Sequence, residues 1–247
     1  MIFNEPPQTP YDLRFRVLGI PVRVHPMFWL VSAIMGARGN QEPREMLIWV
    51  ATVFFSILVH ELGHALVARA YGWAPWITLY SFGGLASYRP TDRSALKQII
   101  ISFAGPAAGF LFAGVIVSLI VASGHRVGFG WPRTAIPVLF EFYENDNLNR
   151  LLFDLLYVNI FWGLVNLLPI WPLDGGKIAQ EVLQTIHPRD GLVMSLWLSI
   201  FVAVGAGILA LIRLDDKFLM FFCGYLAYSS YQSLQALSGG GGWGGYR

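Results

Sequence analysis

The sequence predicts an all-α polytopic membrane protein with about six transmembrane helices and a short membrane-dipping β-hairpin after the second helix. The composition supports this fold class. Apolar residue types make up 55% of the 247 residues and charged types only 13%, and the mean hydropathy is +0.53. A soluble globule needs more surface charge than this, and a disordered chain needs lower hydrophobicity. The placement of the few charges also leaves long uncharged stretches.

These uncharged stretches have the length of membrane spans. A helix needs about 20 apolar residues to cross ~30 Å of hydrocarbon. We expect spans at residues 24–37, 46–70, 97–123, 153–173, 191–212 and 218–237. The first is short, and it could instead be a signal anchor or a longer span that begins near Val17. The spans form one domain, residues 1–237, and residues 238–247 form a flexible glycine-rich tail.

The charges also bear on orientation and on partners. With six spans, ten lysines and arginines fall on the side of the two termini and seven on the other side. Basic residues concentrate on the cytoplasmic side of membrane proteins, so we expect both termini in the cytoplasm and the chain in the cell membrane. The net charge of +2 provides no broad basic face for nucleic acid. The expected partners are the lipid bilayer and other membrane proteins.

The second span contains the ionisable residues His60, Glu61 and His64 in the pattern H-E-x-x-H. A charge in the hydrocarbon costs at least ~2.5 kcal/mol, so such residues indicate function. Histidines four residues apart share one face of a helix and can supply two ligands of a tetrahedral zinc site. Glu61 then lies beside the metal, where it can take a proton from zinc-bound water. The alternative is two histidines packed in a helix bundle with a protonated glutamate.

A catalytic zinc site needs a third protein ligand, and Asp174 is the candidate. This residue follows the helix-breaking Pro169 and Pro172 at the end of the fourth span. If the spans alternate in direction, Asp174 reaches a membrane depth similar to that of His64. Asp174 could instead be an exposed residue at a simple helix end. Asp154 is the rival carboxylate, but it lies at the opposite end of the fourth span.

Two glycine pairs follow the H-E-x-x-H motif. Residues 73–90 carry β-forming residues on both sides of Gly83 and Gly84, which predicts a hairpin. Its exposed edge could bind an unwound peptide by strand addition, so both glycines are candidate substrate-binding residues. The alternative is an interfacial aromatic loop. Gly105 and Gly109 form G-x-x-x-G, which favours close packing of the third span against the second.

With these motifs the sequence resembles the compact six-span branch of the site-2 protease family of intramembrane zinc metalloproteases. That family carries H-E-x-x-H on one transmembrane helix and N-x-x-P-x-x-x-L-D-G on another. The matching residues here are His60, Glu61, His64, Asn166, Pro169, Leu173, Asp174 and Gly175. The resemblance covers about residues 15–237, and we expect neither the PDZ nor the CBS domains that some members carry.

The resemblance implies roles for individual residues. His60, His64 and Asp174 would bind one zinc ion, and Glu61 would be the catalytic base. Asn166 would line the cleft and hold substrate or polarise its carbonyl group. Asn159 fits a family position of similar polar character, so it is a further candidate substrate-binding residue.

The function that follows is a zinc-dependent endopeptidase that hydrolyses peptide bonds in or near the transmembrane segments of membrane proteins, near the cytoplasmic face. Two other functions stay open. One is a catalytically silent relative that only binds membrane partners. The other is a divalent-cation transporter or sensor, although the sequence shows no internal repeat of the kind that transporters usually have.

Overall fold

The computed structural model describes residues 5–37, 42–81, 83–92, 94–129, 138–213 and 216–239. The chain divides into two compact units. Unit 1 contains Met1–Arg93 and Phe103–Val165, and unit 2 contains Ser94–Ser102 and Asn166–Arg247. Most of the predicted glycine-rich tail, from residue 240 onward, lies outside the described residues.

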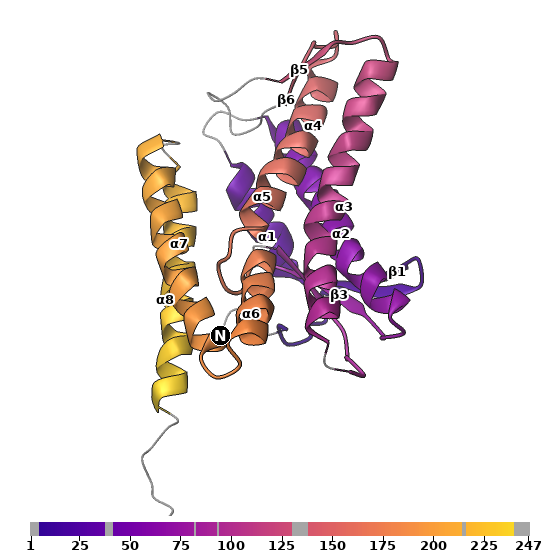
Figure 1. The fold of residues 1–247 in the computed structure, drawn as a ribbon. Coiled ribbons are helices and arrows are strands. Elements are labelled where there is room, and N and C mark those ends of the chain that lie inside the picture. The colour runs from indigo at the N-terminus through magenta and orange to yellow at the C-terminus, as the bar shows by residue number, and fades with distance from the viewer. Residues whose placement is uncertain are drawn as a thin grey trace, which may run out of the picture. The chain divides into compact units, whose positions relative to one another are not determined.

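Unit 1 combines helices with two small sheets (Figure 1). Its elements in chain order are β1 (Leu13–Val17), β2 (Ile20–Val24), α1 (Pro26–Gly36), α2 (Pro43–Ala70), β3 (Trp76–Tyr80), β4 (Gly83–Ser87), most of α3 (Ala95–Ala122), β5 (Val127–Phe129), β6 (Val138–Phe140), α4 (Asp146–Tyr157), the π-helix η1 (Val158–Trp162) and nearly all of α5 (Gly163–Asn166). The larger sheet has the strand order β1-β2-β3-β4, and β5 pairs with β6.

The larger sheet contains more strands than the sequence analysis expected. β3 and β4 are antiparallel and flank the expected turn, while β1 and β2 form a second antiparallel pair, and β2 runs parallel to β3. The sequence does alternate apolar and basic residues over Leu13–Val17, which is a strand pattern. Leu18 and Gly19 form the turn with φ of 50° and 80°.

One face of the larger sheet is apolar and packs on α1 and α2. Ile20, Val22 and Val24 of β2 and Ile77 and Leu79 of β3 are all buried in one cluster with residues of both helices. Since side chains alternate across a strand, the intervening residues face the other way. The sheet is therefore held against the N-terminal half of unit 1 by apolar burial.

The opposite face of the sheet is polar and covered by the N-terminal segment. Arg23 forms ion pairs of 3.0 Å with Glu5 and with Asp12. Burial raises the pKa of Asp12, but hydrogen bonds from Thr9 and the pairing with Arg23 outweigh it and lower this pKa to about 2. Glu5 also accepts a hydrogen bond from the Thr78 hydroxyl on β3 (2.8 Å). These contacts tie the N-terminal residues to the sheet.

The helices of unit 1 pack closely where small residues allow it. A Cβ atom added at Gly63 of α2 would meet the backbone of Ala104 and the Cβ of Ala108 at 2.7 Å, so α2 and α3 approach through this glycine. Figure 1 shows α3 beside α4, and Ile116 of α3 and Leu156 of α4 are buried in one cluster.

Unit 2 contains α6 (Asp174–Ile186), α7 (Gly191–Arg213) and α8 (Lys217–Gly239), together with the first turns of α3. α7 and α8 lie side by side, drawn in orange and yellow in Figure 1. The N-terminal end of α7 also packs on α6, since Gly191 lies against the backbone of Leu183.

Within the residues that the structure describes, four helical segments are long and apolar enough to cross a membrane: Pro43–Ala70, Ala95–Ala122, Asp146–Asn166 and Gly191–Arg213. The first expected span is represented by α1, which has 11 residues and a length of only about 16 Å. α8 has 23 residues but carries tyrosine, serine and glutamine in its second half. Six spans therefore remain a prediction.

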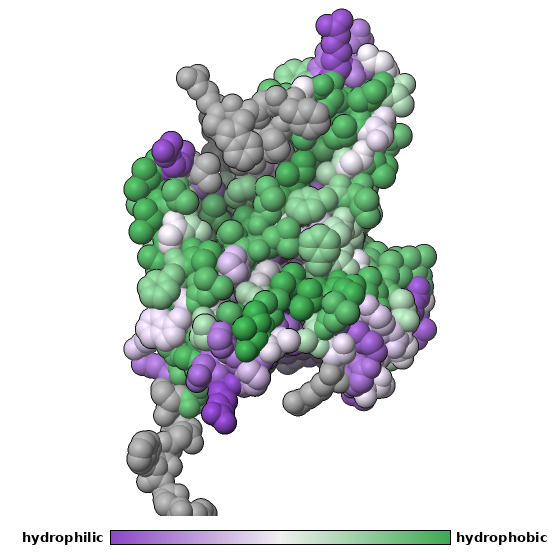
Figure 2. Space-filling model, viewed as in Figure 1, coloured by the Kyte–Doolittle hydropathy of each residue, from purple (hydrophilic) through white to green (hydrophobic). Residues whose placement is uncertain are grey.

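The surface agrees with residence in a membrane. Figure 2 shows hydrophobic residues over most of the visible face, with hydrophilic residues confined to patches. Large apolar side chains are exposed along the long helices, among them Leu111, Leu119, Phe201 and Ile212. Such a surface is costly in water and is typical of helices that contact lipid.

Candidate metal centre

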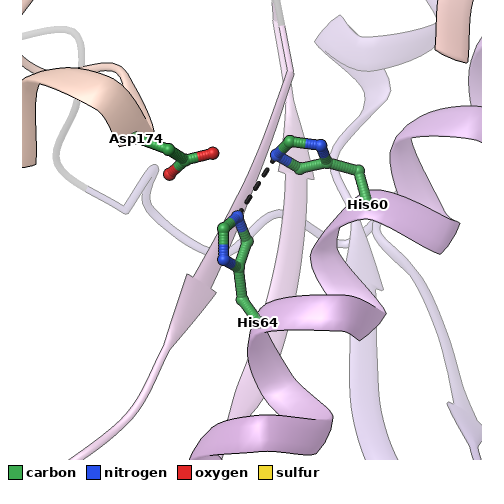
Figure 3. A group of neighbouring side chains, drawn as sticks. All are labelled: His60, His64 and Asp174. Carbon is green, nitrogen blue, oxygen red and sulfur yellow. Dashed lines mark hydrogen bonds between the residues drawn. The ribbon is translucent and has the colours of Figure 1, made fainter. Parts of the chain in front are cut away.

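The two histidines of the H-E-x-x-H motif face one another on α2. His60 and His64 are each 6% exposed, and their Nε2 atoms lie 3.2 Å apart (Figure 3). The four-residue spacing places both side chains on the same face of the helix, one turn apart. The rings meet edge to face, with an interplanar angle of 79°.

This separation fits a shared metal ion. Two imidazole nitrogens at 2.0–2.1 Å from a tetrahedral zinc ion are about 3.3 Å apart. The observed 3.2 Å between the Nε2 atoms is close to this value. The same separation permits one hydrogen bond between two neutral rings. In either case the two Nε2 atoms lie close enough together for one metal ion to bind both.

Gly105 of α3 provides the space in which the imidazole rings meet. A Cβ atom added there would overlap the His64 ring and lie 2.8 Å from Nε2 of His60. From the sequence alone, Gly105 was predicted to serve helix packing. The structure shows that Gly63 packs on α3, whereas the missing side chain of Gly105 leaves space for the two histidine rings. The motif G-x-x-x-G was the available signal, but it does not say which side chain faces each glycine.

Glu61 points to the edge strand β4. Its Oε2 atom accepts a hydrogen bond of 2.7 Å from the backbone N–H of Ala86. A Cβ atom at Gly84 would lie 2.6 Å from Oε1 of Glu61, so any larger residue at this position would displace the carboxylate. Glu61 itself is 6% exposed. The Ala86 N–H group could not be predicted from the sequence, because nearly every residue type carries a backbone N–H donor.

The two glycines of the predicted hairpin differ in their surroundings. Gly84 lies against Glu61, whereas a Cβ atom at Gly83 would meet no atom within 4 Å. β4 is at one edge of the described four-stranded sheet. An edge strand has backbone groups that can pair with another extended chain.

Asn159 lies in the π-helix η1 and contacts α2. Its Nδ2 atom donates to the Ser56 hydroxyl (2.9 Å) and to the carbonyl oxygen of Leu155 (2.8 Å). Asn159 is 4% exposed and Ser56 3% exposed. Ser56 precedes His60 by one helical turn, so this contact lies next to the histidine pair along α2. Ser56 was not expected to take part in the site.

Asp174 is the first residue of α6. The prediction from the sequence, that it ends the fourth span, is therefore wrong in this detail. The helical stretch that begins at Asp146 ends at Asn166, not at residue 173. Pro169 and Pro172 lie in the irregular segment that follows, as helix-breaking residues should. Asp174 is 4% exposed, and its Oδ1 atom lies 3.1 Å from Nζ of Lys177. A carboxylate in the first turn of a helix is also favoured by the helix dipole.

The glycines after Asp174 allow the preceding loop to fold onto α6. A Cβ atom at Gly175 would overlap the carbonyl group of Leu167 and lie 2.5 Å from the Leu168 oxygen, and one at Gly176 would lie 2.5 Å from the Trp171 nitrogen. Both glycines are helical, so their role is close approach rather than a positive φ. Trp171 further donates its backbone N–H to the Ser199 hydroxyl of α7 (2.9 Å).

Asn166 and Asp154 occupy different settings. Asn166 is the last residue of α5 and is 7% exposed. Asp154, the rival carboxylate, is 2% exposed and accepts a hydrogen bond of 2.8 Å from Nε of Arg150. Arg150 in turn lies 3.9 Å from Glu45 of α2. Asp154 is thus part of a separate ion-pair cluster.

Comparison with known proteins agrees with this geometry. A model of peptidase family M50 matches residues 48–208, which is most of the chain. The chain belongs to peptidase family M50. It is similar to the zinc metalloprotease MJ0392 of Methanocaldococcus jannaschii, with 30% identity over 179 residues, covering 70% of this chain and 46% of that protein. It is also similar to stage IV sporulation protein FB of Bacillus subtilis, with 30% identity, covering 64% of this chain and 46% of that protein.

The fold is shared with a solved M50 structure. The site-2 protease from Methanocaldococcus jannaschii superimposes with a TM-score of 0.58 and 24% sequence identity, covering 91% of this chain and 95% of that chain. This chain spans slightly less than half the length of the two sequence relatives. Membership of M50, together with the apolar helices, makes this chain an integral membrane protein.

Proposed function

We propose that this protein is a zinc-dependent intramembrane endopeptidase that cleaves membrane proteins in or near their transmembrane segments. The observation that carries the proposal is the pair of Nε2 atoms 3.2 Å apart on a membrane-capable helix, with Glu61 anchored beside them. Membership of peptidase family M50 supports hydrolysis of peptide bonds. The relative MJ0392 is named a zinc metalloprotease, which supports zinc as the metal.

We propose His60, His64 and Asp174 as the three protein ligands of one zinc ion. The two buried histidines of α2 and the buried carboxylate of Asp174 supply donor types that support the set. Two neutral imidazoles and one carboxylate form a common donor set for catalytic zinc, and three protein ligands leave one position for water. Asp174 belongs to unit 2, and we propose it as the third ligand.

Glu61 is proposed as the general base and acid. A bound zinc ion would lower the pKa of a coordinated water and polarise the scissile carbonyl group. The Glu61 carboxylate accepts the proton from the attacking water and then donates it to the nitrogen of the leaving amine. The hydrogen bond from Ala86 holds one carboxylate oxygen, so that the other oxygen is directed to the reacting groups.

The substrate is proposed to bind along β4 and near Asn166. An extended peptide could add to the outer edge of β4 beside Gly83 and Gly84, since β4 ends the order β1-β2-β3-β4 among the described residues. Strand addition would also unwind a helical substrate, whose peptide bonds are otherwise shielded. The amide of Asn166 would hold the substrate carbonyl group. The sheet is proposed to dip into the membrane at this point.

The location follows from the basic residues. We propose the cell membrane, with both termini and the active site toward the cytoplasm. The support is the distribution of ten basic residues on the side of the termini and seven on the other side of six spans.

The first test is the variant Glu61→Gln in purified protein. Removal of the base is expected to lower cleavage of a transmembrane substrate in detergent by about 10²-fold or more, while the zinc content stays at one per chain. Glu45→Gln, the same substitution on the same helix, is the matched control and should retain cleavage.

Three outcomes would contradict the proposal in different ways. Unchanged turnover of Glu61→Gln would exclude Glu61 as the base. Wild-type protein without zinc and without cleavage would favour a silent binding protein. Metal flux in proteoliposomes without proteolysis would favour a transporter.

A further inference from the structure

The π-helix η1 interrupts the apolar helix that runs from Asp146 to Asn166. A single π turn inside an α-helix shifts the backbone hydrogen bonds by one residue and is often found at functional sites. Here the side chain of Asn159 donates to the Leu155 oxygen at 2.8 Å, an oxygen that also accepts from the backbone N–H of Val158. Asn159 thus stabilises the distorted turn itself.

The same amide connects this turn to the helix that carries the histidines. Nδ2 of Asn159 also donates to the Ser56 hydroxyl, at 2.9 Å. Because residues four apart share a helical face, Ser56 lies directly below His60 on α2. The bond is buried, with Asn159 4% and Ser56 3% exposed, so loss of either partner would leave an unsatisfied polar group in an apolar interior.

Asn159 is also enclosed on the side of α3. A Cβ atom added at Gly109 would lie 3.4 Å from the backbone oxygen of Asn159 and 3.5 Å from its Oδ1 atom. Gly105, one turn earlier on the same face of α3, faces the histidine pair. The Asn159 side chain is therefore held between α2 and α3, one turn from the residues that face the metal.

We propose that Asn159 is a positioning residue for the metal ligands and not a substrate contact. Both hydrogens of its Nδ2 group are used, one by Ser56 and one by Leu155, so none is left to donate to a substrate carbonyl group. The Asn159–Ser56 bond fixes η1 against α2 at the level of His60. η1 is followed directly by α5, which ends at Asn166. The Asn159–Ser56 bond therefore fixes the start of the segment that leads to Asn166 and Asp174.

The inference rests on the proposed zinc function and predicts a defect in the metal site. We expect Ser56→Ala and Asn159→Ala each to release zinc to a chelator about tenfold faster and to lower kcat about tenfold, with little change in KM. The visible spectrum of the Co²⁺-substituted protein should also change, because it reports the geometry of the ligands. Ser56→Thr, which keeps the hydroxyl group, should restore all three properties.

Thr52→Val is the matched control. Thr52 lies on the same face of α2, one turn before Ser56, and its buried hydroxyl has no hydrogen-bond partner within the described residues. Its loss should leave zinc release, the Co²⁺ spectrum and kcat within twofold of the wild type. If Asn159→Ala does not fold, the smaller change Ser56→Ala still tests the proposal.

The double variant separates coupling from two independent defects. If the Asn159–Ser56 bond is what matters, Ser56→Ala together with Asn159→Ala should be no worse than the more severe single variant. Variants that raise KM while they keep kcat and the Co²⁺ spectrum would overturn the inference in favour of substrate binding. Variants like the wild type in every measurement would also overturn it, whereas an inactive wild type would instead contradict the proposed function.

Discussion

Gly105 leaves the space in which the imidazole rings of His60 and His64 meet. The histidines could be predicted from the sequence, because the four-residue spacing alone places two such side chains on one helical face. The role of Gly105 could not, since it depends on which part of α3 crosses α2. A glycine motif predicts close helix packing, and here one of its glycines serves the candidate metal centre.

At the residue scale we predict that Gly105→Ala weakens metal binding. The added methyl group would overlap the His64 ring, so the two Nε2 atoms could not remain 3.2 Å apart. Zinc affinity, measured by chelator competition, should fall at least about tenfold. Gly114→Ala on the same helix is the control, because its Cβ atom would meet nothing within 4 Å. Equal zinc affinity in the two variants would show that Gly105 is not part of the metal centre.

At the scale of elements, β4 connects the larger sheet to the site. It supplies the Ala86 N–H group that binds Glu61, and Gly84 gives the carboxylate room. The β-forming residues around Gly83 and Gly84 predicted strands at these positions. They did not predict that one strand would contact Glu61, which depends on the pairing of β3 with both β2 and β4. The alternating pattern of β1 was present in the sequence, but a five-residue segment is too short to distinguish a strand from an irregular segment before the first span.

We predict that Gly84→Ala and Gly83→Ala differ. A methyl group at Gly84 would displace the Glu61 carboxylate and should lower kcat by about tenfold or more, with zinc retained. A methyl group at Gly83 has open space, so kcat should stay within twofold. Steady-state cleavage of a transmembrane substrate measures both variants. Equal kcat values in the two variants would contradict this role of Gly84.

At the scale of the whole molecule, composition predicted a membrane protein rich in helices, and four helical segments of the described part of the chain fit a membrane span. The break at Pro169 and Pro172 was readable from the sequence, yet the helix before it ends at Asn166 and Asp174 begins a new helix. Local sequence could not set these bounds. The loop between them is held by contacts distant in the chain, such as the Trp171 backbone with Ser199.

The central claim is that one metal ion is held by two imidazoles of α2 and by the carboxylate of Asp174. Zinc K-edge X-ray absorption of the purified protein, compared with Asp174→Ala, tests it most directly. The account predicts one zinc per chain with two imidazole nitrogens and carboxylate oxygen at about 2.0–2.2 Å, and loss of the carboxylate ligand with weaker zinc binding in the variant. A zinc shell without two imidazoles, or an identical shell and affinity in Asp174→Ala, would contradict it.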